Sequence, residues 1–240
     1  MAIRFARRSP SSRSSSRTGL DDVIDAEERG GEYCGLHVLA DDDPRWPKNP
    51  VEQARDACAG GAPIVQLRTK HATDRQALAW AEAIREITRA AGARFVVNDR
   101  FDLALLAEAD AVHFGQDDLP PNALPRDVRA RLAVGRSTHT PEQLRATRDE
   151  DIDYVAFGPV FGTTSKESEY DQRGLDALRE AVALAAPRPL VAIGGITAGH
   201  VETLRDFGVG GFAVISVVAG APDPVAATKD LVSRFGGASG

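Results

Sequence analysis

Three polar residues after the second apolar segment of the chain could hold a phosphorylated ligand. Gln66, Arg68 and Lys70 alternate along a short stretch, and in extended backbone such residues point to the same face. Two cations and an amide on one face suit the oxygens of a pyrophosphate, because charge-assisted hydrogen bonds to phosphate are strong. Taken alone, the same motif could also be a solvated strand end, so its meaning depends on the residues near it.

Two carboxylates follow the next two apolar segments. Asp99 stands directly after Asn98, and Asp118 ends the run Gln116-Asp117-Asp118. Mg²⁺ is typically bound by one or two carboxylates and completes its shell with water and substrate phosphate oxygens. Asp99 and Asp118 are therefore the expected ligands of a Mg²⁺ ion that would also touch the pyrophosphate. Asp117 is the alternative second ligand.

Hydroxyl groups and glycines follow the last four apolar segments. They are Ser137–Thr140 after the fifth, Thr163, Thr164, Ser165 and Lys166 after the sixth, Gly194–Thr197 after the seventh, and Ile215 with Ser216 after the eighth. The group after the sixth segment suits a carboxylate or a second anion, although a polar flexible loop explains it equally well. Backbone N–H groups of the last two loops bind phosphate in many α/β barrels, and Gly195 lets the backbone approach a ligand. The sequence therefore predicts two anion sites, and hence two phosphorylated substrates or one substrate with two phosphate ends.

Eight short apolar segments place these residues in a fold. The segments are Leu36–Leu39, Ile64–Leu67, Phe95–Val97, Ala111–Phe114, Leu132–Val134, Tyr154–Phe157, Leu190–Ile193 and Phe212–Ile215. Each is almost continuously apolar, as strands covered on both faces are, and amphipathic helical patterns fill the intervals. Alternating strands and helices indicate a parallel sheet, and eight strands favour a single (β/α)₈ TIM barrel with its active site where the strands end. A doubly wound open sheet is the alternative, but no G-x-G-x-x-G motif follows the first segment.

Capping signals mark several helix boundaries. Asn49 before Pro50 predicts a helix start, and Gly92 predicts a helix end. Thr140 and Gln143 have the spacing of a capping box. These signals place helices between the apolar segments, as a barrel requires.

Composition limits the classes of protein that this chain could belong to. The 240 residues carry a formal net charge of −6, yet residues 1–20 contain five arginines and no acid, so the remainder is strongly acidic. An acidic body argues against a general nucleic-acid-binding protein. No apolar run reaches the roughly 20 residues that a membrane span requires. Two cysteines are too few for a disulfide framework, and we expect reduced thiols in a cytoplasmic protein.

The Arg- and Ser-rich amino-terminal segment differs in composition from the rest of the chain. It has little apolar periodicity, and we expect residues 1–30 to form a disordered basic extension. Transit peptides have a similar composition, which is the alternative interpretation. Residues 31–240 then form one domain, because a single α/β barrel needs about 250 residues.

Taken together and in order, these motifs resemble those of the thiamine phosphate synthase family. The resemblance covers residues 35–235 and rests on Gln66-Leu67-Arg68-Thr69-Lys70, Val97-Asn98-Asp99, His113-Phe114-Gly115-Gln116-Asp117-Asp118, Ser137-Thr138-His139-Thr140, Gly158-Pro159-Val160-Phe161, Thr163-Thr164-Ser165-Lys166, Ile193-Gly194-Gly195-Ile196 and Val214-Ile215-Ser216. It implies a transferase of thiamine biosynthesis that displaces pyrophosphate from 4-amino-5-hydroxymethyl-2-methylpyrimidine diphosphate with the nitrogen of a thiazole phosphate. The products would be thiamine phosphate and pyrophosphate, with loss of CO₂ when the thiazole is carboxylated.

The resemblance also implies a role for each residue of the site. The pyrimidine diphosphate would be held by Gln66, Arg68, Lys70 and Asn98, and contacted by Ser137 and Lys166. Lys70, Ser137 and Lys166 would be the catalytic residues, and Asp99 and Asp118 would bind Mg²⁺. The thiazole carboxylate would be held by Thr163 and Ser165, and the thiazole phosphate by Gly195, Ile215 and Ser216. The family often has Thr where this chain has Ser165, which keeps the hydroxyl.

Two other functions are compatible with the same barrel. A thiazole tautomerase acts on the thiazole phosphate alone with a histidine after the fifth strand, and His139 would serve, although His139 could equally orient Ser137. That enzyme needs no metal–pyrophosphate site, whereas this chain has Asp99 and Asp118 beside its lysines. A catalytically silent sensor of thiamine precursors is the other alternative. The expected partners are small phosphorylated substrates, without nucleic acid or membrane, and a homo-oligomer is compatible with the sequence.

Overall fold

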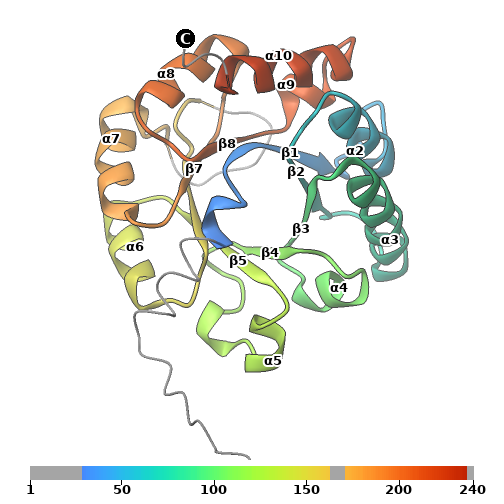
Figure 1. Cartoon of the computed structure of the whole chain (residues 1–240), viewed down its shortest axis with the longest axis horizontal. Coiled ribbons are helices and arrows are strands. Elements are labelled where there is room, and N and C mark those ends of the chain that lie inside the picture. Colours follow the sequence, from blue (N-terminus) through green and yellow to red (C-terminus); the bar gives the residue numbers. More distant parts are fainter. Residues whose placement is uncertain (1–28, 163–170, 237–240) are drawn as a thin grey trace, which may run out of the picture.

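The computed structural model describes residues 29–162 and 171–236 of the chain, and the predicted extension lies almost entirely outside them. Eight parallel strands form a closed barrel in chain order (Figure 1). They are β1 Gly35–Asp41, β2 Ile64–Arg68, β3 Arg94–Asn98, β4 Ala111–Phe114, β5 Ala133–Thr138, β6 Tyr154–Phe157, β7 Leu190–Ile193 and β8 Gly211–Val214. The ring closes where β8 pairs with β1. The predicted TIM barrel is confirmed.

Helices surround the barrel on its outside (Figure 1). The α-helices are α2 Pro50–Ala59, α3 Asp74–Ala91, α4 Phe101–Leu106, α5 Arg126–Arg129, α6 Pro141–Ala146, α7 Gly174–Ala185, α8 Val201–Asp206, α9 Ser216–Ala219 and α10 Pro224–Gly236. The 3₁₀ turns are η1 Pro121–Ala123, η2 Thr147–Asp149 and η3 Ala198–His200. No helix among the described residues has the length and apolar character needed to cross a membrane.

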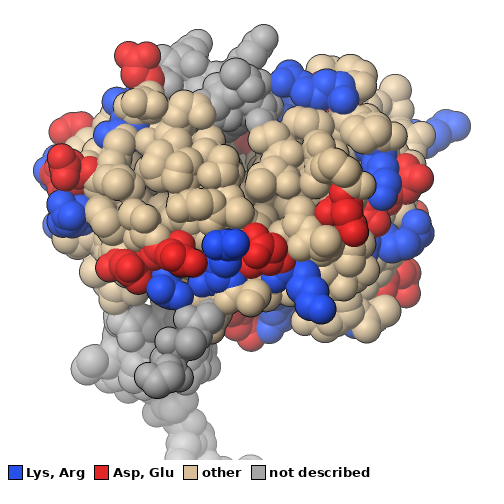
Figure 2. Space-filling model, turned by 90° about the horizontal axis from the view of Figure 1, so that it is seen from above, with Lys and Arg blue, Asp and Glu red and all other residues tan. Residues whose placement is uncertain are grey.

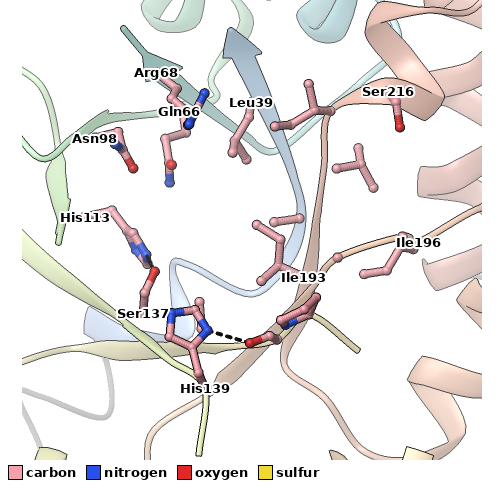
Figure 3. Close-up of a pocket in the computed structure, with 18 of the residues that line it drawn as sticks. Leu39, Gln66, Arg68, Asn98, His113, Ser137, His139, Ile193, Ile196 and Ser216 are labelled. Carbon is pink, nitrogen blue, oxygen red and sulfur yellow. Dashed lines mark hydrogen bonds between the residues drawn. The ribbon is translucent and has the colours of Figure 1, made fainter. Parts of the chain in front are cut away.

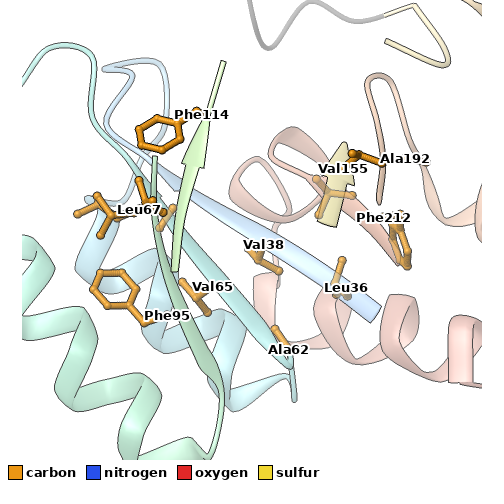
Figure 4. Packing of buried hydrophobic residues seen from close by; sticks show 14 of the residues in the cluster. Leu36, Val38, Ala62, Val65, Leu67, Phe95, Phe114, Val155, Ala192 and Phe212 are labelled. Carbon is orange, nitrogen blue, oxygen red and sulfur yellow. The ribbon is translucent and has the colours of Figure 1, made fainter. Parts of the chain in front are cut away.

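Two apolar clusters follow from the alternation of side chains along each strand. Leu36 and Val38 of β1 point outward into the cluster between strands and helices (Figure 4). Leu39 points into the barrel, where it joins a second cluster with Ile64 and Val96. This interior layer is packed rather than hollow, and above it, at the carboxyl ends of the strands, is the place where barrels of this fold bind their ligands.

The fifth strand is longer than its apolar segment predicts. The sequence places its end at Val134, but the strand continues to Thr138. Arg136 pairs with β4, and Ser137 and Thr138 pair with β6, so backbone hydrogen bonds carry the strand through polar residues. Ser137 is therefore held by the ladder instead of standing on a loop.

The capping predictions hold at two of three places. The Asn49 side chain accepts from the amides of the first turn of α2, in a complete capping box, and Gly92 ends α3 with φ of 69°. Thr140 accepts from the Gln143 amide at 3.2 Å, as predicted. The Gln143 side chain, however, accepts from the His139 amide at 2.6 Å, one residue before the expected partner. The box is thus shifted, and it fixes the backbone of His139 at the end of β5.

In the view of Figure 2, acidic and basic side chains lie next to one another along the lower edge and at the sides, while other residues form the middle of the face. Most ion pairs on the surface join exposed groups, such as Arg89 with Glu86 and Arg145 with Glu142. Such pairs contribute little to stability.

Candidate active site

A pocket opens at the carboxyl ends of the strands, and each of the eight strands contributes to it or leads into it (Figure 3). Its space is about 820 Å³ when the part open to solvent is included. Among the residues predicted to bind ligands, the lining includes Gln66, Arg68, Asn98, Ser137, Gly195, Ile215 and Ser216. Lys70, Asp99 and Asp118 are outside the lining, and Thr163, Ser165 and Lys166 lie outside the described residues.

Arg68 is held by a buried carboxylate that the sequence interpretation missed. Its Nη1 lies 2.5 Å from Oδ2 of Asp41, which is fully buried at the end of β1. The other carboxylate oxygen of Asp41 accepts from Trp46 Nε1 at 3.1 Å. A guanidinium has five N–H donors, so Asp41 can orient Arg68 and still leave donors for an anion in the pocket.

Lys70 does not share a strand face with Gln66 and Arg68, contrary to the sequence prediction. Strand β2 ends at Arg68, and the chain then bends. Asp42 sets the bend, since its carboxylate accepts from the backbone amides of Lys70, His71 and Ala72 at 2.8, 2.9 and 2.8 Å. The bend carries the Lys70 ammonium to Asp99, with Nζ and Oδ2 2.5 Å apart. Because three backbone amides of the bend donate hydrogen bonds to its carboxylate, Asp42 is the residue that positions Lys70.

Replacing Asp42 with alanine should lower the free energy of unfolding by about 1–3 kcal/mol, because three amides of the bend lose their acceptor. Chemical denaturation would measure the change. Asp43→Ala is the control. The Asp43 carboxylate accepts one hydrogen bond from a backbone amide, that of Arg45, and makes a surface ion pair with the Arg45 side chain. Equal losses in the two variants would contradict the role of Asp42.

Asp99 and Asp118 lie together, as the sequence predicts for a shared cation. Burial and the neighbouring carboxyl of Asp118 raise the pKa of Asp99, while Lys70 opposes them. Asp118 Oδ2 accepts from the Gly115 amide at 2.6 Å, which fixes that carboxylate, whereas Asp117 is exposed. Two carboxylates that stand side by side favour a cation between them, because each disfavours the charge of the other.

This acidic pair fits a divalent ion only if other ligands come from elsewhere. Within residues 29–162 and 171–236, no group of three or more His, Cys, Asp or Glu side chains is placed to hold a metal. Mg²⁺ tolerates such a site, because it usually keeps several waters and takes phosphate oxygens from its substrate. The donor set therefore fits Mg²⁺ in company with a phosphorylated ligand.

Ser137 is hydrogen-bonded to His113, a residue of the family motif His113-Phe114-Gly115-Gln116-Asp117-Asp118 for which the sequence predicted no partner. His113 Nε2 lies 2.8 Å from Ser137 Oγ, and its Nδ1 lies 3.0 Å from the hydroxyl of Tyr154. His139, considered as a residue that orients Ser137, donates from Nδ1 to the Gly158 carbonyl at 2.6 Å, the dashed line of Figure 3. The sequence signals for His113 were its place near the end of an apolar segment and in the family motif that begins with it.

The opposite side of the pocket is formed by the turns after β7 and β8. Gly194 and Gly195 both have positive φ, 101° and 61°. A side chain at Gly195 would come within 2.2 Å of the Gly162 carbonyl oxygen. Glycine is thus required there by the neighbouring loop, and not only by a ligand as the sequence suggested. Ser216 is exposed at the start of α9 and faces the pocket.

Comparison with known proteins identifies the chain's relatives. Residues 36–218 match the family model of thiamine monophosphate synthase. The thiamine-phosphate synthase of Methanoculleus marisnigri is 43% identical over 203 residues, covering 85% of this chain and 96% of that relative. The thiamine-phosphate synthase of Anaeromyxobacter dehalogenans is 47% identical over 203 residues, covering 84% and 87%.

A solved structure agrees with these matches. The thiamine phosphate pyrophosphorylase of Pyrococcus furiosus superposes with a TM-score of 0.77 at 33% identity, covering 89% of this chain and 100% of that one. The resemblance inferred from the motifs is confirmed. The chain belongs to the thiamine monophosphate synthase family.

Proposed function

We propose that this protein is a thiamine phosphate synthase, which joins 4-amino-5-hydroxymethyl-2-methylpyrimidine diphosphate to a thiazole phosphate and releases pyrophosphate. Besides membership of the family, one observation on the arrangement of the site supports this proposal. The carboxylate pair Asp99 and Asp118 stands beside Lys70 on one side of the pocket, while Gly195 and Ser216 line the other. A metal–pyrophosphate site at the edge of the pocket, next to the lining residue Asn98, would then lie beside a second anion site in the opposite wall.

The diphosphate half of the site would lie over β2 to β5. Gln66, Arg68 and Asn98 would bind the pyrimidine diphosphate from the pocket wall, and Lys70 would reach its outer phosphate from the bend. Asp99 and Asp118 would hold Mg²⁺, which when bound neutralises charge on the departing pyrophosphate. Ser137 would contact the same substrate from β5. Cations beside the leaving group stabilise the charge that develops as its bond to carbon breaks.

The thiazole half would lie over β6 to β8. Gly195, Ile215 and Ser216 line the pocket where the thiazole phosphate would bind. Thr163 and Ser165, which follow β6 in the sequence, would hold a carboxylate of the thiazole, and Lys166 would reach the diphosphate. This half needs no acid or base, because the thiazole nitrogen itself forms the new bond.

Apolar side chains separate the two halves and would exclude water. Leu39, Ala156, Ile193 and Ala213 line the pocket between its polar ends. The aminopyrimidine can stabilise a benzyl-like cation once pyrophosphate has left, and water would destroy that cation. A dry floor and two oriented substrates favour capture by the thiazole nitrogen instead.

A turnover assay with both substrates and Mg²⁺ tests the proposal. We expect thiamine phosphate and pyrophosphate in equal amounts, with no change of the thiazole phosphate when it is supplied alone. Isomerisation of the thiazole phosphate without the pyrimidine substrate would indicate a tautomerase. Binding of both substrates without product would indicate a sensor.

We further propose that the enzyme is cytoplasmic, acts on small phosphorylated molecules without nucleic acid, and can form homo-oligomers. Residues 31–240 would be the catalytic domain, with residues 1–30 as an extension outside it. Size-exclusion chromatography of the chain with and without residues 1–20 would test the oligomeric state and the role of the extension together.

A further inference from the structure

Side chains from three adjacent strands meet inside the barrel below the pocket. His113 of β4 and Tyr154 of β6 are joined by the 3.0 Å contact between Nδ1 and the phenol oxygen. The strand between them, β5, carries Gly135, which pairs with His113 on one side and with Tyr154 on the other. The hydrogen bond therefore passes over a position that has no side chain.

Gly135 leaves the room that this contact needs. A Cβ atom there would lie 2.4 Å from His113 Nδ1 and 2.5 Å from the Tyr154 hydroxyl oxygen. Those are the two atoms that form the hydrogen bond. Any other residue at this position would push the imidazole and the phenol apart, so the contact is built into the barrel.

The positions of the protons decide which group donates in each hydrogen bond of the series Tyr154–His113–Ser137. Among the described residues, the Tyr154 hydroxyl has one hydrogen-bond partner, His113 Nδ1, and Tyr154 is 1% exposed. Burial raises the pKa of this phenol well above its ordinary value, so it keeps its proton. A buried O–H that donates to nothing is costly, so Tyr154 donates to Nδ1. A neutral imidazole that accepts at Nδ1 carries its hydrogen on Nε2, and Nε2 then donates to Ser137 Oγ.

Because His113 donates to Ser137, the Ser137 hydroxyl can act as a hydrogen-bond donor to a ligand. Its oxygen already accepts from His113, and its carbonyl accepts from Gln116 Nε2 at 2.5 Å. The Ser137 hydrogen is left to donate, and the side chain lines the pocket. We propose that Tyr154 and His113 are positioning residues that hold the Ser137 hydroxyl as a hydrogen-bond donor to an acceptor atom of the pyrimidine diphosphate, an inference that rests on the proposed function.

Kinetics of two matched tyrosine variants test the proposal. Tyr154→Phe should lower kcat about three- to tenfold, the range expected for one hydrogen bond, and leave the Michaelis constant for the thiazole phosphate within about twofold. Tyr33→Phe is the control, because the Tyr33 ring stacks on that of Tyr154 at 5.1 Å but its hydroxyl donates to the Asp110 carbonyl. The control should keep kcat within about twofold.

A double-mutant cycle separates positioning from a structural role. If Tyr154 acts through Ser137, then Tyr154→Phe should change kcat by less than about twofold in a Ser137→Ala background. Full and additive losses in the double variant would overturn the proposal. So would equal losses of kcat in Tyr154→Phe and Tyr33→Phe, since these would reflect general damage to the barrel floor.

The nitrogen resonances of His113 in the unmodified protein give a readout that needs neither variants nor turnover. Nitrogen-15 NMR should show His113 protonated at Nε2 and bare at Nδ1. A proton on Nδ1, or on both nitrogens, would overturn the donor chain even if the enzyme is active. If the expected tautomer is found but no thiamine phosphate is made, the proposed function is wrong, while the hydrogen bonds from Tyr154 to His113 and from His113 to Ser137 remain valid.

Discussion

Replacing Asp99 with asparagine should lower Mg²⁺-dependent turnover by about a hundredfold, which corresponds to roughly 2.7 kcal/mol of transition-state stabilisation. Asp99 is half-buried beside Asp118, and an amide cannot take the place of its charge on a cation. Initial rates measured across a Mg²⁺ titration would show the loss. A rate close to that of the unmodified protein at low Mg²⁺ would remove Asp99 from the metal site.

Asparagine is the suitable replacement because of the backbone at this position. Asp99 has φ of 65°, in the left-handed region that asparagine tolerates and alanine does not. Asp117→Asn is the matched control, since Asp117 is exposed next to Asp118 and is the alternative ligand. If Asp117→Asn loses more activity than Asp118→Asn, the second ligand is Asp117.

Lys70→Ala should lower kcat/KM for the pyrimidine diphosphate tenfold to a hundredfold, because a charge-assisted contact contributes roughly 1.5–3 kcal/mol. Affinity for the thiazole phosphate should change little. Ser216→Asp should do the reverse, since it places a carboxylate where the thiazole phosphate is expected and Ser216 is exposed. Titration of each variant with the two substrates separately measures both effects.

The choice of Ser216 follows from the structure. Gly195→Val would be the obvious test of the thiazole phosphate site, but its side chain would strike the Gly162 carbonyl, so loss of activity would not report on phosphate. Lys70→Arg is the companion variant that keeps the charge at the bend. If Lys70→Ala and Ser216→Asp weaken the same substrate, the division of the pocket into two anion sites is wrong.

Most of the fold could be predicted from local sequence patterns. Continuous apolar segments such as Tyr154–Phe157 are typical of strands buried on both faces, and the structure has β6 at these residues. β5 was underestimated, because Ser137 and Thr138 are polar and only their backbone pairing with β6 makes them strand. Periodicity detects what a side chain faces, whereas pairing depends on a neighbour far away in the sequence.

The sequence predicted which residues belong to the site better than it predicted the contacts between them. Spacing placed Asp99 and Asp118 together, because both follow neighbouring strands that end at the same edge. It could not show that Asp41 holds Arg68, or that His113 reaches across β5 to Tyr154. Those pairs depend on the register of the barrel and on burial, which a linear pattern does not contain.

The ring of strands around the pocket has a consequence for dividing the protein. A fragment ending after β4 would keep Gln66, Arg68 and the Asp99–Asp118 pair, and the complementary fragment would keep Gly195 and Ser216. Most of the groups proposed for the pyrimidine diphosphate lie in the first half, while Ser137, Lys166 and the groups proposed for the thiazole phosphate lie in the second. Two separately produced halves should therefore be inactive alone and regain synthesis only when their strand edges rejoin, which makes activity a reporter of barrel assembly.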